Sequence, residues 1–350
     1  MERVVEAVAP RLAARGHDVT VYCAATGPND PDEYQGVRLK HIRSPRSKHL
    51  DTLLRSALAT FREMFGRNQI VHYHASGSAP LAFLPRLMGK KVVVTVHGLD
   101  WQRRKWNLFG RLFLQVGEWA AMRLPHRTVV VGPDLKAALD GLYGSDVLLI
   151  PNGVEDRTQR PAREILERGL THRGFILFLA RLVPEKQCHT LIEAWMSLAD
   201  KHGQKLAIAG PSWHSADYAA SLKEMAKNDP SVVFLGEVSE QMLEELYSNC
   251  TAYVLPSEVE GMSLSLLDAM AFGACVVASD IPPNAYVVAD AGYTFPVRDT
   301  AALGRCLRRI LDNPEEAEQR RAAARARINS EFRWDSIALK WESLYRELLR

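Results

Sequence analysis

Residues 252–271 read AYVLPSEVEGMSLSLLDAMA, and this stretch decides the fold class. Its first four residues are apolar or aromatic and predict a short buried strand. A loop that contains Pro256 and Gly261 follows, and an apolar helix is expected from about residue 263. A strand, a glycine-containing loop and a helix in this order form the repeating unit of a doubly wound α/β sheet.

The same alternation extends in both directions along the chain. Short apolar strands are expected at residues 19–22, 70–74, 92–96, 128–131, 147–150, 175–179, 205–209, 232–235, 252–255 and 275–278. Helical segments lie between most of them, which favours parallel sheets that are covered by helices on both faces. We therefore predict an α/β fold of two doubly wound, Rossmann-like domains in series.

Charge supports a division into two parts. Residues 1–165 carry 24 Lys and Arg against 16 Asp and Glu, a net charge of +8. Residues 166–350 carry 20 against 25, a net charge of −5. Opposite signs on the two halves indicate domains with different partners, joined within residues 151–173.

Composition excludes several classes of protein. The chain has 350 residues, of which 47% are hydrophobic and 24% charged, the profile of a globular protein rather than a disordered or fibrous one. No apolar run reaches the ~18–20 residues of a transmembrane helix. Five scattered cysteines without zinc-like spacing predict free thiols in a reducing compartment, so the cytoplasm is the expected location.

Charged and imidazole side chains follow several of the expected strands. Arg181 and Lys186 come after residues 175–179, at an edge where doubly wound sheets bind ligands, and they can clamp a diphosphate. The alternative is ordinary surface charge on a loop. His74 and His97 also end strands, although a single histidine in such a place is more often structural. The backbone N–H groups of residues 262–264 form an anion site at a helix N-terminus.

Together these segments resemble the GT-B glycosyltransferases, and within them the retaining group called family 4. Arg181 and Lys186 match the family's R-x4-K motif, Glu260 begins its E-x7-E motif with Asp268 in the second position, and His97 matches its strand-end histidine. Residues 46–52 and 98–101 are similar to a rhamnosyltransferase-like subgroup. The resemblance covers essentially the whole chain.

The resemblance implies an architecture. It predicts an N-terminal, acceptor-side domain at residues 1–160 and a nucleotide-sugar-binding domain at 161–332, which face a central cleft. Residues 333–350 would form a helix that crosses back to the N-terminal domain. The family's first strand and Gly-Gly loop belong before Glu2. We expect the N-terminal domain to lack that strand, which would leave a gap with unpaired backbone groups, and we expect the chain to be truncated there.

The resemblance also implies roles for individual residues. Arg181 and Lys186 would bind the departing diphosphate, Glu260 the hydroxyls of the donor sugar, and His97 would approach that sugar from the N-terminal domain. Asp268 would bind the ribose. Further donor-binding positions are Gly261, Met262, Ser263, Leu264, Leu235, Gly236 and Glu237, and acceptor-side positions are His74, Asp100 and Asn152.

We therefore expect a hexosyltransferase that moves a sugar, with retention, from a nucleotide diphosphate sugar to a glycan or lipid-linked acceptor in cell-surface polysaccharide biosynthesis. No Asp-x-Asp sequence occurs, so we predict metal-independent chemistry and no cofactor besides the donor. The basic N-terminal half fits peripheral contact with an anionic membrane, at the inner face. The alternative is that its Lys and Arg side chains only solvate the surface. No nucleic-acid-binding module is recognisable.

Two other hypotheses about the function remain open. One is a GT-B protein that binds a nucleotide but does not transfer a sugar, and the other is a nucleotide-sugar epimerase of the same architecture. A dehydrogenase and a P-loop NTPase are disfavoured, because neither G-x-G-x-x-G after a strand nor G-x4-G-K-[ST] occurs.

Overall fold

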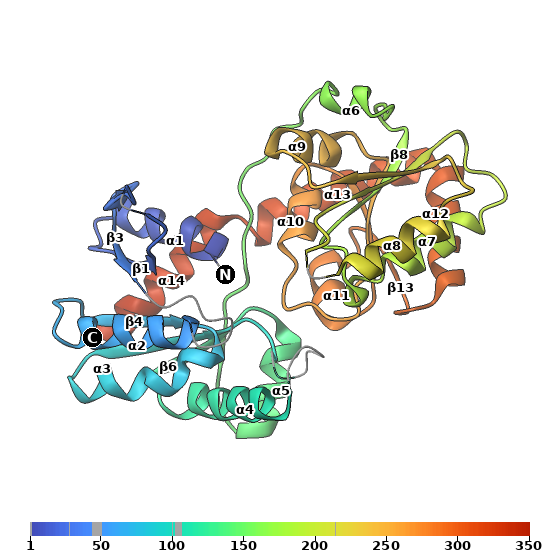
Figure 1. Cartoon of the computed structure of the whole chain (residues 1–350). Coiled ribbons are helices and arrows are strands. Elements are labelled where there is room, and N and C mark those ends of the chain that lie inside the picture. The colour runs from blue at the N-terminus through green and yellow to red at the C-terminus, as the bar shows by residue number, and fades with distance from the viewer. Residues whose placement is uncertain (1, 28, 44–50, 100, 102–106, 214) are drawn as a thin grey trace. The chain divides into compact units, whose positions relative to one another are not determined.

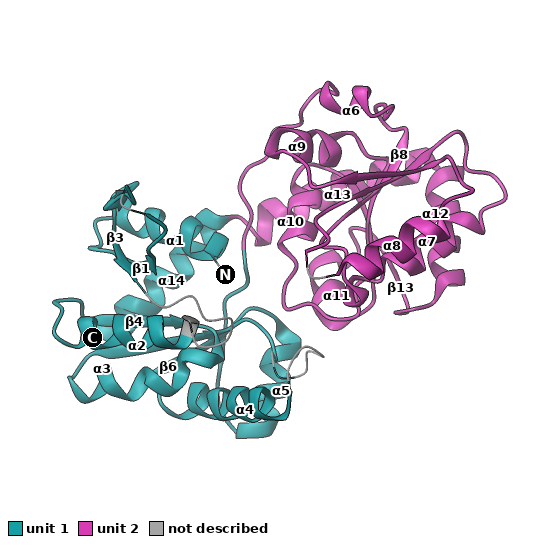
Figure 2. Ribbon diagram, in the orientation of Figure 1, with its two compact units in different colours: residues 1–152, 334–350 teal, residues 153–333 magenta. Residues whose placement is uncertain are grey.

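The computed structural model describes the whole chain except residues 1, 28, 44–50, 100, 102–106 and 214. It divides into two compact units. Unit 1 comprises residues 1–152 and 334–350, and unit 2 comprises residues 153–333 (Figure 2). Both are α/β structures whose larger sheets are entirely parallel, so the predicted fold class is confirmed.

Unit 1 contains two separate sheets. One has the order β4-β5-β6-β7, and the other has the order β1-β3-β2 with β2 antiparallel. The strands of the first sheet are β4 (Ile70–His74), β5 (Lys91–Val96), β6 (Arg127–Val130) and β7 (Leu148–Leu149). Those of the second are β1 (Thr20–Ala24), β2 (Glu33–Tyr34) and β3 (Val37–Ile42). Figure 1 shows β1 and β3 standing apart from the sheet that contains β4.

Helices surround these two sheets. They are α1 (Glu2–Ala14), α2 (Asp51–Met64), η1 (Ser76–Ala82), α3 (Phe83–Leu87), α4 (Leu108–Arg123), α5 (Pro133–Tyr143) and α14 (Trp334–Leu349). The terminal helix α14 packs against α1, where Glu342 accepts hydrogen bonds from Arg15 at 2.5 Å and from His17 at 2.9 Å. The last helix of the chain is therefore part of unit 1.

A cavity of about 560 Å³ lies between β1 and β4, and we call it the slot. Its walls come from both strands and from helices α1, α2 and α14. The described residues of unit 1 place no strand between β1 and β4.

Unit 2 is built on one six-stranded parallel sheet of order β10-β9-β8-β11-β12-β13. Its strands are β8 (Phe175–Leu179), β9 (Lys205–Ala209), β10 (Val232–Gly236), β11 (Ala252–Leu255), β12 (Cys275–Ser279) and β13 (Tyr293–Phe295). The chain moves outward from β8 to β10, returns to β11 and then continues in the opposite direction. The strand order thus reverses between β8 and β11, and such a switch point is where open α/β sheets bind ligands.

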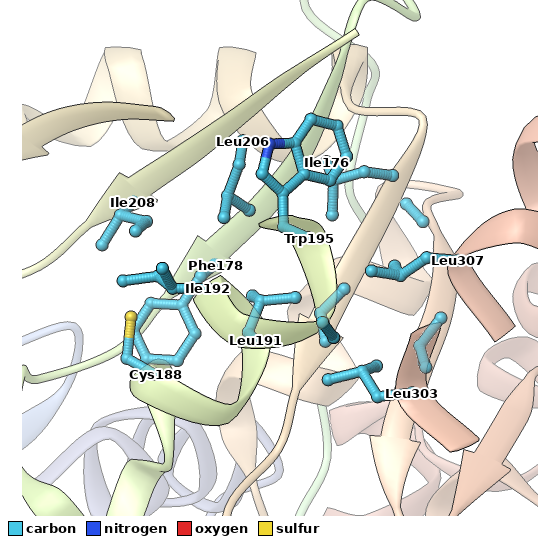
Figure 3. Close-up of a cluster of buried hydrophobic side chains, with 14 of the residues drawn as sticks. Ile176, Phe178, Cys188, Leu191, Ile192, Trp195, Leu206, Ile208, Leu303 and Leu307 are labelled. Atoms are coloured by element: carbon cyan, nitrogen blue, oxygen red, sulfur yellow. The ribbon is translucent and has the colours of Figure 1, made fainter. Parts of the chain in front are cut away.

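Helices cover this sheet as well. They are α6 (Glu164–Glu167), η3 (Pro184–Lys186), α7 (Cys188–Met196), α8 (Ala216–Met225), α9 (Glu240–Asn249), α10 (Leu264–Ala271), α11 (Pro282–Val288), α12 (Thr300–Asp312) and α13 (Pro314–Glu331). A buried cluster joins α7 and α12 to the strands, and Leu191 and Trp195 of α7 belong to it (Figure 3). Burying each such side chain stabilises the folded state by roughly 1.5–3 kcal/mol. A well-packed core therefore holds the strands of unit 2 in place.

Candidate functional site

Two loops meet where the strand order of unit 2 reverses. The loop after β8 carries Arg181 and Lys186, and the loop after β11 carries Glu260 before it enters α10. Lys186 Nζ donates to Glu260 Oε1 at 2.5 Å, and both side chains are largely buried. The structure thus brings together the two charged motifs that the sequence singled out, and Lys186 and Glu260 form an ion pair there.

Arg181 lies at the rim of the same loop. Its side chain is 57% exposed, and its guanidinium is 3.7 Å from Glu185 at the nearest atoms. An exposed ion pair of this length stabilises the fold by well under ~1 kcal/mol. The guanidinium therefore keeps most of its capacity to bind an anion.

Polar contacts that the sequence did not reveal fix the two loops to each other. Gln187 adopts a left-handed conformation with φ of 53°, and its amide donates to the Glu258 carboxylate. The backbone N–H of Glu258 donates to the carbonyl of Glu185 at 2.9 Å. Arg298 Nε donates to the same oxygen, Glu258 Oε1, at 2.5 Å. Glu258 therefore connects the loop after β8 with the start of the loop after β11.

The helix N-terminus predicted at residues 262–264 is present. Helix α10 begins at Leu264, and Ser263 caps it by accepting from the N–H of Leu266 at 3.3 Å. Ser265 is held by the hydroxyl of Tyr253 at 2.9 Å, and burial raises the pKa of that phenol. The first turn of α10 is thus anchored to β11, while Gly261 and Met262 lead into it.

Asp268 lies in the middle of α10 and is buried. Its carboxylate is 3.2 Å from Arg157, whose guanidinium also lies over the ring of Phe272 at 5.4 Å. Sequence reasoning missed Arg157, because the two charges are 111 positions apart and no local pattern connects them. The carboxylate expected to bind ribose therefore faces an arginine from the start of unit 2.

The remaining donor-side positions lie on the outer strand of one half of the sheet. Leu235 and Gly236 end β10, and Glu237 follows. The carbonyl of Gly236 accepts from the N–H of Gly210 at 2.7 Å. A Cβ atom on Gly210 would lie 1.9 Å from the carbonyl oxygen of Ala180, so only glycine fits there. Gly210 was also missed, although Ala-Gly-Pro-Ser directly after a strand is a readable turn signal.

In unit 1 the strand-end histidines form a stack. His74 Nδ1 is 3.4 Å from His97 Nε2, and their rings are stacked at 5.7 Å. The ring of His72 lies beside that of His74, with centroids 4.2 Å apart, and its nitrogens contact Thr95 at 2.7 Å and Tyr345 at 2.6 Å. Burial, with the charge of His74, lowers the pKa of His97 to about 3, and burial lowers that of His74 to about 4. The stack is therefore neutral at pH 7.

The other acceptor-side positions are less informative. Asn152 is buried at the end of the first segment of unit 1. Asp100 lies outside the described residues. Across the described part of the chain, no helix combines the length and the hydropathy that a membrane crossing requires.

Comparison with known proteins gives the same assignment for both units. Residues 1–157 match the model for "Glycosyltransferase Family 4", and residues 165–327 match that for "Glycosyl transferases group 1". A glycogen synthase of Mycobacterium tuberculosis is 27% identical, over 98% of this chain and 90% of its own length. An alpha-D-kanosaminyltransferase of Streptomyces kanamyceticus is 24% identical, over 85% and 81%.

Solved structures agree on the fold. Sucrose-phosphate synthase of Thermosynechococcus elongatus has a TM-score of 0.84 at 24% identity, covering 99% of this chain and 92% of its own. Anabaena HepE, solved with UDP and glucose, has a TM-score of 0.81 at 15% identity, covering 99% and 95%. The two charged motifs meet at one switch point, and the family models match both units. The chain therefore belongs to the GT-B glycosyltransferases of family 4.

Proposed function

We propose that this chain moves a sugar from a nucleoside diphosphate sugar to a glycan or lipid-linked acceptor, with retention at the anomeric carbon, in cell-surface polysaccharide biosynthesis. The observation that carries the proposal is the pairing of Lys186 with Glu260 beside the N-terminus of α10, at the switch point of unit 2. The relatives named above are sugar transferases, which supports this reaction class.

Donor binding would separate the ion pair. A diphosphate brings two or more negative charges, which compete with the single carboxylate of Glu260 for the ammonium of Lys186. Once released, Glu260 is a hydrogen-bond acceptor for the hydroxyls of the donor sugar. The site therefore exchanges an internal ion pair for two contacts to the donor, and neither charge is left buried and unpaired.

The difficult step is departure of the nucleoside diphosphate. Lys186, Arg181 and the backbone N–H groups at residues 262–264 surround the position where its charge increases, and groups already in place for a developing charge supply the largest part of most rate enhancements. These cationic and dipolar groups are the basis for proposing metal-independent transfer. If EDTA abolishes turnover and Mg²⁺ or Mn²⁺ restores it, the proposal of metal independence is wrong.

The neutral histidine in unit 1 has a separate role. Because the pKa of His97 is lowered to about 3, its imidazole would contact the donor sugar as a neutral hydrogen-bonding group and not as a cation. The carboxylate of Asp268 would accept hydrogen bonds from the ribose hydroxyls while it stays in contact with Arg157. Leu235, Gly236 and Glu237 would flank the base.

The reaction is tested with a panel of nucleoside diphosphate sugars. A true donor raises the unfolding temperature, because a ligand stabilises the fold that it binds. Transfer to a lipid-linked or oligosaccharide acceptor is then followed by NMR, and retention predicts a product with the anomeric configuration of the donor. Conversion of the donor without any acceptor would instead indicate an epimerase, and binding without turnover a non-catalytic protein.

We also propose peripheral contact with an anionic membrane at the cytoplasmic face, which would bring a lipid-linked acceptor to unit 1. One face of α4 exposes six large apolar side chains: Leu108, Phe109, Leu112, Phe113, Val116 and Trp119. Phe109 is 82% exposed, and the first 165 residues carry the net charge of +8. An exposed apolar helix face on a basic domain is suited to an anionic interface.

Co-sedimentation with vesicles containing phosphatidylserine tests this contact. Replacing Leu108 and Phe109 by Gln should weaken binding severalfold, whereas replacing the exposed Leu142 on α5 by Gln should leave it unchanged. Equal binding of all three proteins would contradict the assignment to α4.

A further inference from the structure

Another cavity, of about 100 Å³, lies in unit 2. It borders the first residues of this unit and the last turns of α10 and α13, two helices that lie against each other (Figure 1). We call it the arginine pocket, and its polar lining side chains are Asp156, Arg157, Arg325, Asn329 and Arg333. Among its described lining residues, none is proposed above to bind the donor, so the pocket is a separate feature of unit 2.

The fold brings these side chains together from two distant parts of the sequence. The chain enters and leaves unit 2 side by side, because Val154 forms a parallel bridge with Arg333. Arg157 follows the first of these two passages. Arg325 and Asn329 lie one turn apart near the end of α13, just before the second passage. Three guanidinium groups therefore gather at one place.

The pocket carries an excess of positive charge. Three arginines and one aspartate line it, so its lining has a net charge of +2. Asp156 pairs with Arg333 at 2.8 Å, but its side chain is 81% exposed, and water weakens such a pair. Within the described part of the chain, Arg325 forms no hydrogen bond or ion pair, and its stem packs against Gly273. At least one guanidinium is therefore held in place with its charge unpaired by any carboxylate that the structure describes.

Arg157 has a donor that is not in use. Its Nε is buried and has no hydrogen-bond partner among the residues of known placement. Its other nitrogens are 3.5 Å from Glu244 and 3.2 Å from Asp268, which is long for a charge-assisted bond, and Glu244 has a closer partner in Arg160 at 2.7 Å. A buried N–H without an acceptor is unfavourable, and a bound ion is one way to satisfy it. An oxyanion in the pocket can supply that acceptor.

The size of the pocket limits what it can hold. A water molecule occupies about 30 Å³ of the liquid, so 100 Å³ has room for a group of a few heavy atoms and not for a whole nucleotide. Guanidinium groups match the oxygens of a phosphate with two parallel hydrogen bonds, and the amide of Asn329 adds a further donor.

We propose that the arginine pocket binds a single phosphate group, as the free ion or as the end of a phosphate monoester. Arg157, Arg325 and Arg333 would neutralise its charge, and Arg157 Nε would gain an acceptor. The site is separate from the proposed sugar transfer and does not depend on it.

Calorimetric titration of the full chain with inorganic phosphate tests the proposal, at constant ionic strength because salt screens exposed charges. We expect saturable binding, and sulfate, a tetrahedral dianion of similar size, should compete for the site. Glycerol 3-phosphate is the second probe. An affinity like that of inorganic phosphate supports a pocket for the end of a larger molecule, and much weaker binding supports a pocket for the free ion.

Matched variants locate the site. Arg325→Met and Arg333→Met keep an unbranched apolar stem but lose the guanidinium, and each should weaken phosphate binding about fivefold. Arg308→Met removes an exposed arginine of α12, and Lys186→Met removes a cation of the donor loops; neither should remove the binding.

Three results would each overturn the proposal: no saturable binding to the wild type, equal weakening by R308M and R325M, or binding that is lost in K186M and kept in R325M. The unfolding temperature without phosphate shows whether each variant folds. If one of the two pocket variants does not fold, the other decides.

Discussion

The two units use the same alternation of strands and helices but finish their sheets differently. Unit 2 has one continuous six-stranded sheet, and its switch point carries paired charges that are held by buried contacts. Unit 1 has two sheets around a cavity, and its strand ends carry neutral, stacked imidazoles. From this comparison we predict that unit 2, which carries the proposed donor-binding residues, is the more stable of the two units. We therefore expect two unfolding transitions, with unit 1 melting first.

The largest expected effect is at Gly210, where the continuous sheet leaves no space. Gly210→Ala places a Cβ atom against the backbone of Ala180 and at a φ of 137°, so the strand ends must move apart. We expect unit 2 to lose about 4 kcal/mol of unfolding free energy. Gly203→Ala is the matched control, because its φ is also positive, at 70°, while nothing lies within 4 Å. Gly203→Ala should lower the unfolding free energy by only about 1 kcal/mol. Equal losses for the two variants in denaturant titrations would show that close packing at Gly210 is not the cause.

Acid should affect unit 1 more than unit 2. The pKa values of His74 and His97 are lowered to about 4 and about 3, so the unfolded chain binds protons first as pH falls below 6.5. The contribution of the two histidines is therefore complete above pH 6.5 and is lost progressively as the pH falls towards about 4 for His74 and about 3 for His97. We expect a loss on the order of 2 kcal/mol in unit 1 between pH 7.5 and 5.

Calorimetry at several pH values measures this loss. The variant His97→Asn should flatten the pH dependence of the first transition. A first transition that shifts equally in the wild type and the variant would show that the stack is not its cause.

A smaller effect is expected at the ion pair that holds α10. Arg157→Met leaves Asp268 without its arginine, and breaking this partly buried contact should cost about 1–2 kcal/mol in unit 2. Arg160→Met removes a half-exposed partner of Glu244 and should cost less than about 0.5 kcal/mol. Urea titrations of both variants provide the comparison, and similar midpoints would mean that Asp268 does not depend on Arg157.

Local patterns were enough to predict part of this structure. The run Phe175–Leu179 is continuously apolar and became a buried strand, and the residues after it carry both cations of the site. The half-exposed strand β3 was not predicted, because Lys and Arg interrupt its apolar residues. Helix α5 was also missed, although Pro133 at its start and the left-handed Gly144 at its end are readable signals.

Long-range contacts were beyond such patterns. The bonds from Lys186 to Glu260 and from Arg157 to Asp268 depend on which strands become neighbours, and strand order is a property of the folded sheet. The resemblance placed Lys186 and Glu260 in one site, but it did not show that they would bind each other. The rhamnosyltransferase-like subgroup and the expected roles of His74, Asp100 and Asn152 stay predictions.

The central claim is that the switch point of unit 2 binds a nucleoside diphosphate through Lys186. Calorimetric titration of nucleoside diphosphates into the wild type and into Lys186→Met tests it directly, with Lys201→Met as a control whose ion pair to Asp229 lies elsewhere in unit 2. We predict that K186M weakens binding at least tenfold, about 1.4 kcal/mol, while K201M binds as the wild type does. Unchanged affinity of folded K186M for the diphosphate that binds the wild type would contradict the account.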